Sequence, residues 1–279
     1  MIVAGSIVSV SQAQDAVPMR SNQSATSFLK LKGTVKSLRE IAYETKDSAG
    51  KVLKGKKMED GNRQFLFNER GHVSAIYEYT SNGKINYHDM LYYDVEGKLV
   101  KKWIIKDGDS LGGTNIFKYD SLGNTSELNI YNPSGSLSEK WVYKQDRKGN
   151  VIEEVCYLKD TLYNRLGYSY DETGKCLSFD YYLGKKLDQS HKYEYDSAGR
   201  LYKDVTYSAS GEQTGRQFWT YDNFGNVVLW VNAQGLTIDN WTYTYLYDGH
   251  HNWIRKIGFK DKKKSNYLIE RKIEYYPNE

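Results

Sequence analysis

The sequence has little proline and little cysteine, with three prolines and two cysteines among 279 residues. Two cysteines are too few for the disulfide framework that holds many small secreted domains together. Cys156 and Cys176 fall on alternate strands of the repeat described below, which places them roughly 10 Å apart, beyond the reach of a disulfide. We therefore expect two unpaired, half-buried thiols.

The chain also lacks long apolar runs and a strong charge of either sign. No apolar run approaches the roughly 18 residues of a membrane-spanning helix, so the sequence predicts no membrane span of that kind. Lysine and arginine number 39 against 35 acidic residues, and this near balance does not favour nucleic acid as a partner. An aromatic content of 14% argues against a disordered chain.

Catalytic and metal-binding motifs are missing as well. The five histidines form no zinc-protease motif, and the chain has no nucleophile elbow and no phosphate-binding glycine loop. His250-His251 and the aspartates of the predicted turns could suggest a metal, but each lies where a hairpin turn needs a polar residue. The sequence predicts a protein that is not an enzyme and that holds no metal or cofactor.

The N-terminus resembles the end of a secretory signal peptide. Ile2 to Val10 are apolar or small, and Ser11-Gln12-Ala13 places small residues before a cut after Ala13. A buried first strand is the alternative for this segment. The polar, Ser-rich stretch that follows is typical of a disordered leader. We expect a signal peptide remnant at 1–13, a leader at 14–32 and one folded domain at 33–279, in a protein that is secreted, periplasmic or on the cell surface.

Tyrosine and glycine are abundant, at 26 and 24 residues. A glycine recurs every 25 or 26 residues and closes an Asp-x-x-Gly turn in most copies. The positions are Gly71, Gly97, Gly123, Gly149, Gly174, Gly199 and Gly225, with His251 at the eighth. A period held over so many steps indicates repetition of one supersecondary unit.

Each repeat has the pattern of a β-hairpin. Aromatic residues stand six and four positions before the glycine, as Tyr168 and Tyr170 do, and a spacing of two places them on one face of a strand. The aspartate three positions before the glycine can accept backbone hydrogen bonds, and the glycine supplies a positive φ. The turn-forming residues expected in this way include Asp94, Gly97, Asp120, Gly123, Asp171, Gly174, Asp196, Gly199, Asp222 and Gly225.

The predicted fold is all-β: an antiparallel meander of about 17 short strands in a strongly twisted or curled sheet. A flat sheet would leave the aromatic residues on one face of the strands exposed to water. A β-propeller is the alternative, because two repeats approach the length of one blade. An outer-membrane barrel is disfavoured, since the expected strands are about seven residues long and charged residues occupy the alternate face.

The turn motif itself carries a resemblance. Tyr119-Asp120-Ser121-Leu122-Gly123-Asn124 and the run from Tyr221 to Asn226 resemble the tyrosine-aspartate (YD) repeat of Rhs-type and wall-associated bacterial proteins. The resemblance covers nearly everything after about residue 33. It implies a β-strand spiral that acts as a scaffold or surface-binding module, in a short secreted bacterial member without a toxin domain.

The tryptophans are the candidate ligand-binding residues. Trp219, Trp230 and Trp241 lie in neighbouring predicted strands, and an exposed row of such rings is a platform for stacking against sugars. Burial of both faces by curling of the sheet is the competing account. The sequence thus predicts an exported, non-catalytic scaffold that binds carbohydrate or an envelope protein. The alternative is a spacer or partial shell that docks an effector or assembles through edge strands at Thr34–Tyr43 and Tyr267–Tyr276.

Overall fold

The computed structural model describes residues 29–261 and 264–277. The expected signal segment, residues 1–13, and residues 14–28 of the expected leader lie outside the described residues. The division of the chain into leader and folded domain therefore stays a prediction.

Nineteen strands and a three-residue 3-10 helix (η1) make up the regular structure of the described residues, and the all-β prediction is confirmed. The strands span 5 to 14 residues, and most are longer than expected. The elements are β1 (Val35–Ser48), β2 (Lys51–Lys57), β3 (Arg63–Phe67), β4 (Val73–Tyr79), β5 (Ile85–Tyr93), β6 (Leu99–Lys106), η1 (Asp107–Asp109), β7 (Ser110–Tyr119), β8 (Thr125–Tyr131), β9 (Leu137–Gln145), β10 (Val151–Leu158), β11 (Thr161–Tyr170), β12 (Cys176–Leu183), β13 (Lys186–Tyr195), β14 (Leu201–Ser208), β15 (Gln213–Tyr221), β16 (Val227–Gln234), β17 (Thr237–Tyr247), β18 (Trp253–Lys260) and β19 (Lys264–Tyr275). Among the described residues, no helix is long and apolar enough to cross a membrane.

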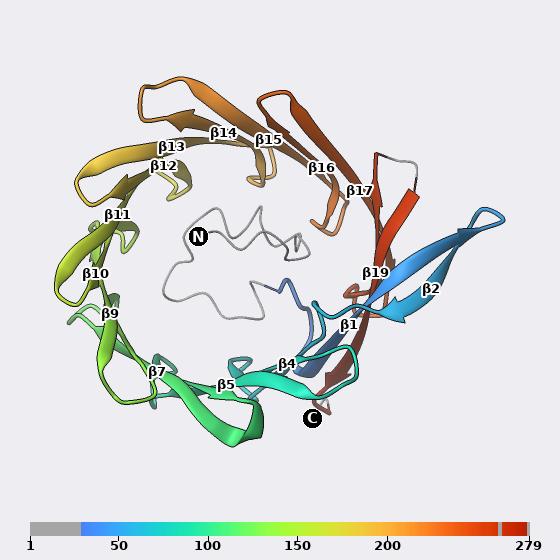
Figure 1. The fold of residues 1–279 in the computed structure, drawn as a ribbon, viewed down its shortest axis with the longest axis horizontal. Coiled ribbons are helices and arrows are strands. Elements are labelled where there is room, and N and C mark those ends of the chain that lie inside the picture. The colour runs from blue at the N-terminus through green and yellow to red at the C-terminus, as the bar shows by residue number, and fades with distance from the viewer. Residues whose placement is uncertain (1–28, 262–263, 278–279) are drawn as a thin grey trace.

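The sheet closes on itself. From β3 to β19 each strand pairs antiparallel with the next, and β1 pairs with both β3 and β19. Figure 1 shows the resulting ring, viewed down its axis. The meander prediction is confirmed, and the curl is complete. A single continuous sheet closed in this way is a β-barrel and not a propeller, because the blades of a propeller are separate sheets.

The two terminal strands are not free edges. Val35 pairs with Tyr275, and the pairing continues to Glu44 opposite Tyr267. The hypothesis that Thr34–Tyr43 and Tyr267–Tyr276 assemble with other molecules by strand addition is therefore wrong, because each strand is the partner of the other. Closure satisfies the backbone groups that two open edges would leave unpaired.

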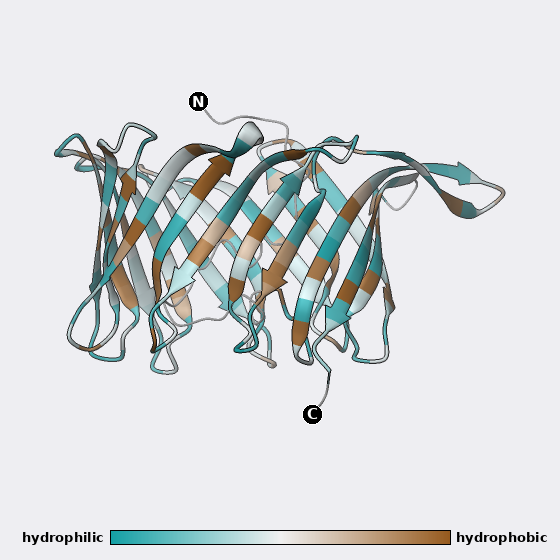
Figure 2. Cartoon of the chain, turned by 90° about the horizontal axis from the view of Figure 1, so that it is seen from below, coloured by the Kyte–Doolittle hydropathy of each residue, from teal (hydrophilic) through white to brown (hydrophobic). Residues whose placement is uncertain are grey.

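Strand β2 departs from the meander. It pairs with β1 between Tyr43 and Ser48, next to the part of β1 that pairs with β3. β2 and β3 therefore follow one another along the same edge of β1, and β2 pairs with no second strand among the described residues. The β1–β2 hairpin extends beyond the barrel wall (Figure 2). Strand β1 is thus a barrel strand over its first part and continues into this projection.

The two ends of the barrel differ. The turns of the Asp-x-x-Gly column connect the strands at one end, which we call the tight-turn rim. The turns between one repeat and the next lie at the other end, which we call the loose-turn rim. Because β1 begins opposite the last residues of β19 and runs antiparallel to β3, the tip of the β1–β2 hairpin lies at the loose-turn rim.

One geometry recurs along the tight-turn rim. Asp94 Oδ1 accepts hydrogen bonds from the N–H groups of Glu96 and Lys98, at 3.0 and 2.8 Å, and Gly97 has a φ of +86°. The same two bonds, from residues two and four positions later, reach Asn68, Asp120, Asp146, Asp171, Asp196, Asp222 and Asp248. These bonds favour the ionised carboxylate; the backbone N–H of Asn124, for example, lowers the pKa of Asp120.

Tyrosines four positions before the glycine connect neighbouring hairpins. The hydroxyl of Tyr119 donates to the carbonyl of Leu99 at 2.8 Å, two residues after the preceding turn glycine. Where the column has Gln145 instead, its amide donates to the equivalent carbonyl of Thr125 at 2.5 Å. The same bond is made by Tyr93, Tyr170, Tyr195 and Tyr221. The column is tyrosine because a phenylalanine would leave this half-buried carbonyl without that partner.

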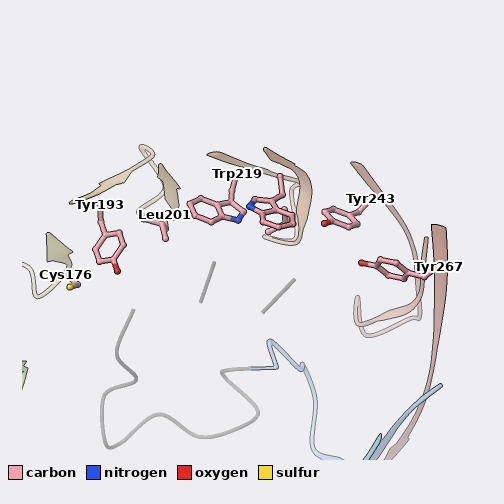
Figure 3. Close-up of a cluster of buried hydrophobic side chains, with 8 residues drawn as sticks. Cys176, Tyr193, Leu201, Trp219, Tyr243 and Tyr267 are labelled. Carbon is pink, nitrogen blue, oxygen red and sulfur yellow. The ribbon is translucent and has the colours of Figure 1, made fainter. Parts of the chain in front are cut away.

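The aromatic columns face the inside of the ring. Tyr193, Trp219, Tyr243 and Tyr267 project from the concave side of the wall (Figure 3). They belong to a cluster that extends from β12 to β19, and a second cluster, which includes Leu38 and Phe65, covers β1, β3 and β4. The wall between them, from β6 to β11, contributes no residue to the buried part of either cluster.

The cysteines lie on alternate strands, as expected, with β11 between them. Cys156 is in β10 and Cys176 is in β12, and both are free. Their burial is deeper than expected, since each is only 1% exposed. Cys156 pairs with Trp141 and Cys176 with Tyr170, and Cys176 packs within the aromatic cluster of β12 to β19.

The residues before β1 lie against the tight-turn rim. Lys30 Nζ donates to the carbonyl of Gly225 at 2.6 Å. The backbone of Lys32 exchanges two hydrogen bonds of 2.8 Å with the side chain of Asn252. Leu29 packs on the cluster of β1, β3 and β4. This segment therefore contacts the seventh and eighth turns and also the wall formed by β1, β3 and β4.

Candidate functional site

The three candidate tryptophans form one row across three strands. Trp219 in β15 pairs directly with Trp230 in β16, which pairs directly with Trp241 in β17. Directly opposed residues project to the same face of a sheet, and Figure 3 places Trp219 on the inner face. The structure thus brings the predicted residues together, on the inside of the ring.

The members of this row differ in exposure. Trp219 is 4% exposed and Trp230 is 7% exposed, so both are packed as core residues. Trp241 is half-buried and lies nearly parallel to Tyr243, with ring centroids 6.5 Å apart and an interplanar angle of 8°. Trp241 is therefore the member of the row with indole surface available to a ligand.

A row of polar side chains runs beside the tryptophans. Gln217 pairs with Asn232, which pairs with Asp239, two residues along each strand toward the loose-turn rim. All three are half-buried. Asn232 is two residues from the end of β16, so the row lies close to the rim. We call the six residues Gln217, Trp219, Trp230, Asn232, Asp239 and Trp241 the Trp–amide patch.

Hydrogen bonds fix part of this patch and leave part of it open. The indole N–H of Trp230 donates to Gln217 Oε1 at 2.9 Å, and Asp239 forms an ion pair with Lys260 at 2.7 Å. The Oδ1 atom of Asn232 is buried and accepts no hydrogen bond from the described residues. A buried amide oxygen without a donor is costly, and a hydroxyl group of a ligand would satisfy it.

A buried cluster of charges lies further along the same wall, toward the tight-turn rim. Glu40 of β1 accepts hydrogen bonds from Arg63 and Arg271, at 2.9 Å each. Lys256 is 4% exposed, and its ammonium group lies 4.5 Å from the ring centroid of Tyr243. Burial lowers the pKa of Lys256 to about 7. The cluster joins β18 to the three strands at which the barrel closes, β1, β3 and β19, and the tyrosine ring connects it to the Trp–amide patch.

Another buried pair, His191 and Asp204, lies on the wall of the barrel between β13 and β14. His191 Nδ1 lies 2.9 Å from Asp204 Oδ1, and the aspartate is 1% exposed. The hydroxyl of Thr206 approaches this same nitrogen at 3.5 Å. A nucleophile activated by histidine contacts the ring nitrogen that is not held by the carboxylate, and the Thr206 hydroxyl does not have that position. The carboxylate orients the imidazole between Phe179 and Tyr193.

The residues that could suggest a metal are held separately. His250 lies over Tyr275 with ring centroids 4.1 Å apart, and His251 stacks on Phe224 at 5.1 Å. Within residues 29–261 and 264–277, no group of three or more His, Cys, Asp or Glu side chains could hold a metal ion. The turn carboxylates are occupied by backbone N–H groups of their own turns.

Comparison with known proteins finds no family model and no curated protein that matches. Among solved structures, a porin-like protein from Bacteroides uniformis is 11% identical, with a TM-score of 0.44, over 88% of this chain and 99% of that one. A porin-like protein from Bacteroides vulgatus has the same coverage, 14% identity and a TM-score of 0.39. The Photorhabdus luminescens Tc holotoxin pore is 14% identical over 74% of this chain, with a TM-score of 0.38, and this chain spans only 12% of that chain.

These similarities are too low to transfer a function, and membership of the YD-repeat family stays a prediction. The role of the three tryptophans also stays a prediction. Sequence reasoning placed these tryptophans on neighbouring strands but missed Gln217, Asn232 and Asp239. Each of the three stands two positions from a tryptophan, so the strand period alone could have indicated them once the tryptophans were aligned.

Proposed function

We propose that this protein is an exported, YD-repeat type scaffold that binds a carbohydrate chain on the inner face of the barrel, at the Trp–amide patch. The observation that carries the proposal is the pairing of two parallel rows: aromatic rings in one row and amide and carboxylate groups in the next. Sugars offer an apolar ring face and a rim of hydroxyl groups, which such rows match.

The roles within the patch follow from exposure. Trp241 provides the stacking surface because its indole is only half-buried. Trp219 and Trp230 hold the wall rigid behind it. Asn232 accepts a hydrogen bond from a sugar hydroxyl, and Asp239 accepts another. A rigid aromatic surface with a few placed polar groups is the usual composition of a small-molecule site.

Access to the patch is from the loose-turn rim. The turn between β16 and β17 is fully exposed at Leu236, and Ile238 is 64% exposed. The polar row begins one residue beyond this exposed position, at Asp239. A linear glycan would enter at this rim and place its hydroxyl groups on the polar row first.

The test is binding of the protein from Gln14 onward to a panel of bacterial and plant polysaccharides, measured by affinity electrophoresis and calorimetry. The Trp241→Ala variant is expected to weaken binding by roughly 10- to 100-fold, as truncation of a central aromatic anchor does. The matched control is Trp103→Ala, which removes a half-buried indole from the outer face, where it packs edge-on against Tyr92. That variant is expected to bind within about twofold of the original protein.

A second variant, Asn232→Ala, isolates the polar row, since its side chain makes no hydrogen bond that would be lost from the described residues. Equal loss of binding in the Trp103→Ala and Trp241→Ala variants would place the site elsewhere. Absence of binding to every polysaccharide would overturn the carbohydrate proposal and favour an envelope protein as the partner.

A further inference from the structure

The projecting part of the β1–β2 hairpin concentrates the positive charge of the chain. Residues 44–57, which we call the basic hairpin, contain five lysines and two acidic residues, a net charge of +3, while the whole chain carries +4. All five lysines are exposed: Lys46, Lys51, Lys54, Lys56 and Lys57. Nearly all of the net charge therefore lies on a hairpin that extends beyond the barrel wall (Figures 1 and 2).

Contacts with β19 involve two side chains of the hairpin. Lys54 forms an ion pair of 2.9 Å with Glu270, and no ion pair involves the other four lysines among the described residues. One of the two acids, Asp47, accepts hydrogen bonds from the backbone and hydroxyl of Ser265, at 3.1 and 2.6 Å. This contact fixes the start of β19 beside the hairpin.

The tip of the hairpin is apolar between its lysines. Leu53 is 48% exposed and Val52 is half-buried, and they lie between Lys51 and Lys54. No other strand covers this part of β2 among the described residues. Lysine on an uncovered strand edge protects against pairing with other chains, but an exposed leucine at the tip works against that protection. The combination of cationic and apolar side chains needs another explanation.

We propose that the basic hairpin docks on the surface of an anionic lipid bilayer. The lysines contact the headgroups, and Leu53 enters the boundary between headgroups and acyl chains, as apolar residues of interfacial segments do. A projecting hairpin reaches such a surface without interference from the barrel wall. A soluble polyanion offers charge but no apolar layer, so it would leave Leu53 without a role.

The experiment uses the protein from Gln14 onward and vesicles of phosphatidylcholine alone or with 30% phosphatidylglycerol, at low salt, with binding measured by co-sedimentation. We expect binding to the anionic vesicles only, weakened strongly at about 0.5 M salt by screening. Each lysine near such a surface changes the partition coefficient roughly fivefold. The variant K51Q/K54Q/K56Q/K57Q is therefore expected to lose binding by about 100-fold or more.

The matched control removes the same charge from the same rim. K84Q/K106Q/K185Q/K186Q changes four exposed lysines that are spread over three other hairpins, and it is expected to bind within about threefold of the original protein. Equal losses in the two variants would show that net charge alone drives binding, and would overturn the proposal. Because all eight lysines are exposed, both variants keep the packing of the barrel, which circular dichroism checks.

The Leu53→Ser variant separates a bilayer from a soluble polyanion, with heparin as the soluble probe. We expect several-fold weaker binding to anionic vesicles and unchanged binding to heparin, because the lysines are intact. Failure to bind the anionic vesicles at low salt would overturn the proposal. Equal affinity of the Leu53→Ser variant and the original protein for vesicles would do the same, since the apolar tip would then have no part in binding.

Discussion

The two rims of this barrel are built on different rules. Along the tight-turn rim one five-residue geometry recurs, with a carboxylate or amide oxygen bonded to two backbone N–H groups and a residue of positive φ closing the loop. Along the loose-turn rim the turns vary: some repeat this geometry, as at Asn132, and others are shorter, as at Gly184 and Gly235. The comparison indicates that one end holds the hairpins together, and this leaves the other end free to carry the Trp–amide patch and the basic hairpin.

The largest expected effect comes from removing the side chain that accepts the backbone hydrogen bonds of a tight turn. Asp222 binds the N–H groups of Phe224 and Asn226 and also accepts from the hydroxyl of Tyr247 on the next hairpin. Asp222→Ala should lower the free energy of unfolding by about 2 to 3 kcal/mol, because hydrogen bonds to a charged group are the stronger ones. Urea denaturation is the measurement.

The control for this change is Asn132→Ala at the loose-turn rim. Asn132 binds the N–H groups of Ser134 and Ser136 in the same way but accepts no hydrogen bond from a second hairpin within the described part of the chain. Its removal should cost about 1 kcal/mol. Similar losses at Asp222 and Asn132 would contradict the proposed difference between the rims.

Alanine in place of a turn glycine gives the next effect. Gly97 and Gly83 both have positive φ, at +86° and +87°, so each substitution carries a cost of about 1 kcal/mol for the left-handed conformation. A Cβ atom on Gly97 would lie 2.7 Å from Cε1 of His72, whereas one on Gly83 would meet nothing within 4 Å. Gly97→Ala should therefore be the more destabilising of the two, by about a further 1 kcal/mol. Thermal melts that rank Gly83→Ala as equal or worse would contradict it.

The connecting tyrosines provide a smaller test. Tyr119→Phe removes the hydroxyl that donates to the Leu99 carbonyl and should cost about 1 kcal/mol. Tyr207, near the loose-turn rim, donates no hydrogen bond to the described residues, and the ammonium group of Lys192 lies over its ring. Tyr207→Phe should therefore change the stability by less than about 0.5 kcal/mol. Denaturation midpoints of the two variants decide the matter, and equal shifts would show that the hydroxyl at Tyr119 does not connect the hairpins.

The smallest effect is a dependence on acid pH. Hydrogen bonds within the tight turns lower the pKa values of Asp120, Asp146, Asp171 and Asp196. A carboxyl with a lowered folded-state pKa stabilises the fold fully above its ordinary pKa near 4, and this contribution is lost as the pH falls through the lower value. Stability should therefore fall below about pH 4, and replacing the four by asparagine, which Asn68 already is, should make the acid limb shallower. Denaturation at pH 3 and pH 5 measures the slope.

Much of the tight-turn rim could be predicted from the sequence because its interactions are local. The Asp94 and Gly97 pattern specifies a turn within five residues, and a period of two places Tyr168 and Tyr170 on one face. Closure of the ring depends instead on pairs such as Ser37 and Glu274, which are 237 residues apart. No local pattern distinguishes an open curled sheet from a closed one, since the difference is a register between two distant strands.

The candidate site was only partly predictable for a related reason. A register shift precedes the tight turns, as between Thr220 and Tyr221, and such a bulge changes which residues of the return strand face inward. Counting alternate positions across the turn therefore does not tell whether Trp230 joins Trp219 or faces away from it. The projecting hairpin lies outside the repeat period altogether, so β2 was not expected.

In a closed barrel of equal hairpins, the number of repeats sets the circumference. Each repeat contributes two strands, or about 10 Å of circumference, while its turn and its tyrosine bond involve only that repeat and its neighbour. Recombination between copies in the gene would widen or narrow the ring in fixed steps without altering any turn. The diameter of such a protein can therefore change in evolution through the number of its repeats. The β1–β19 pairing would close rings of different size.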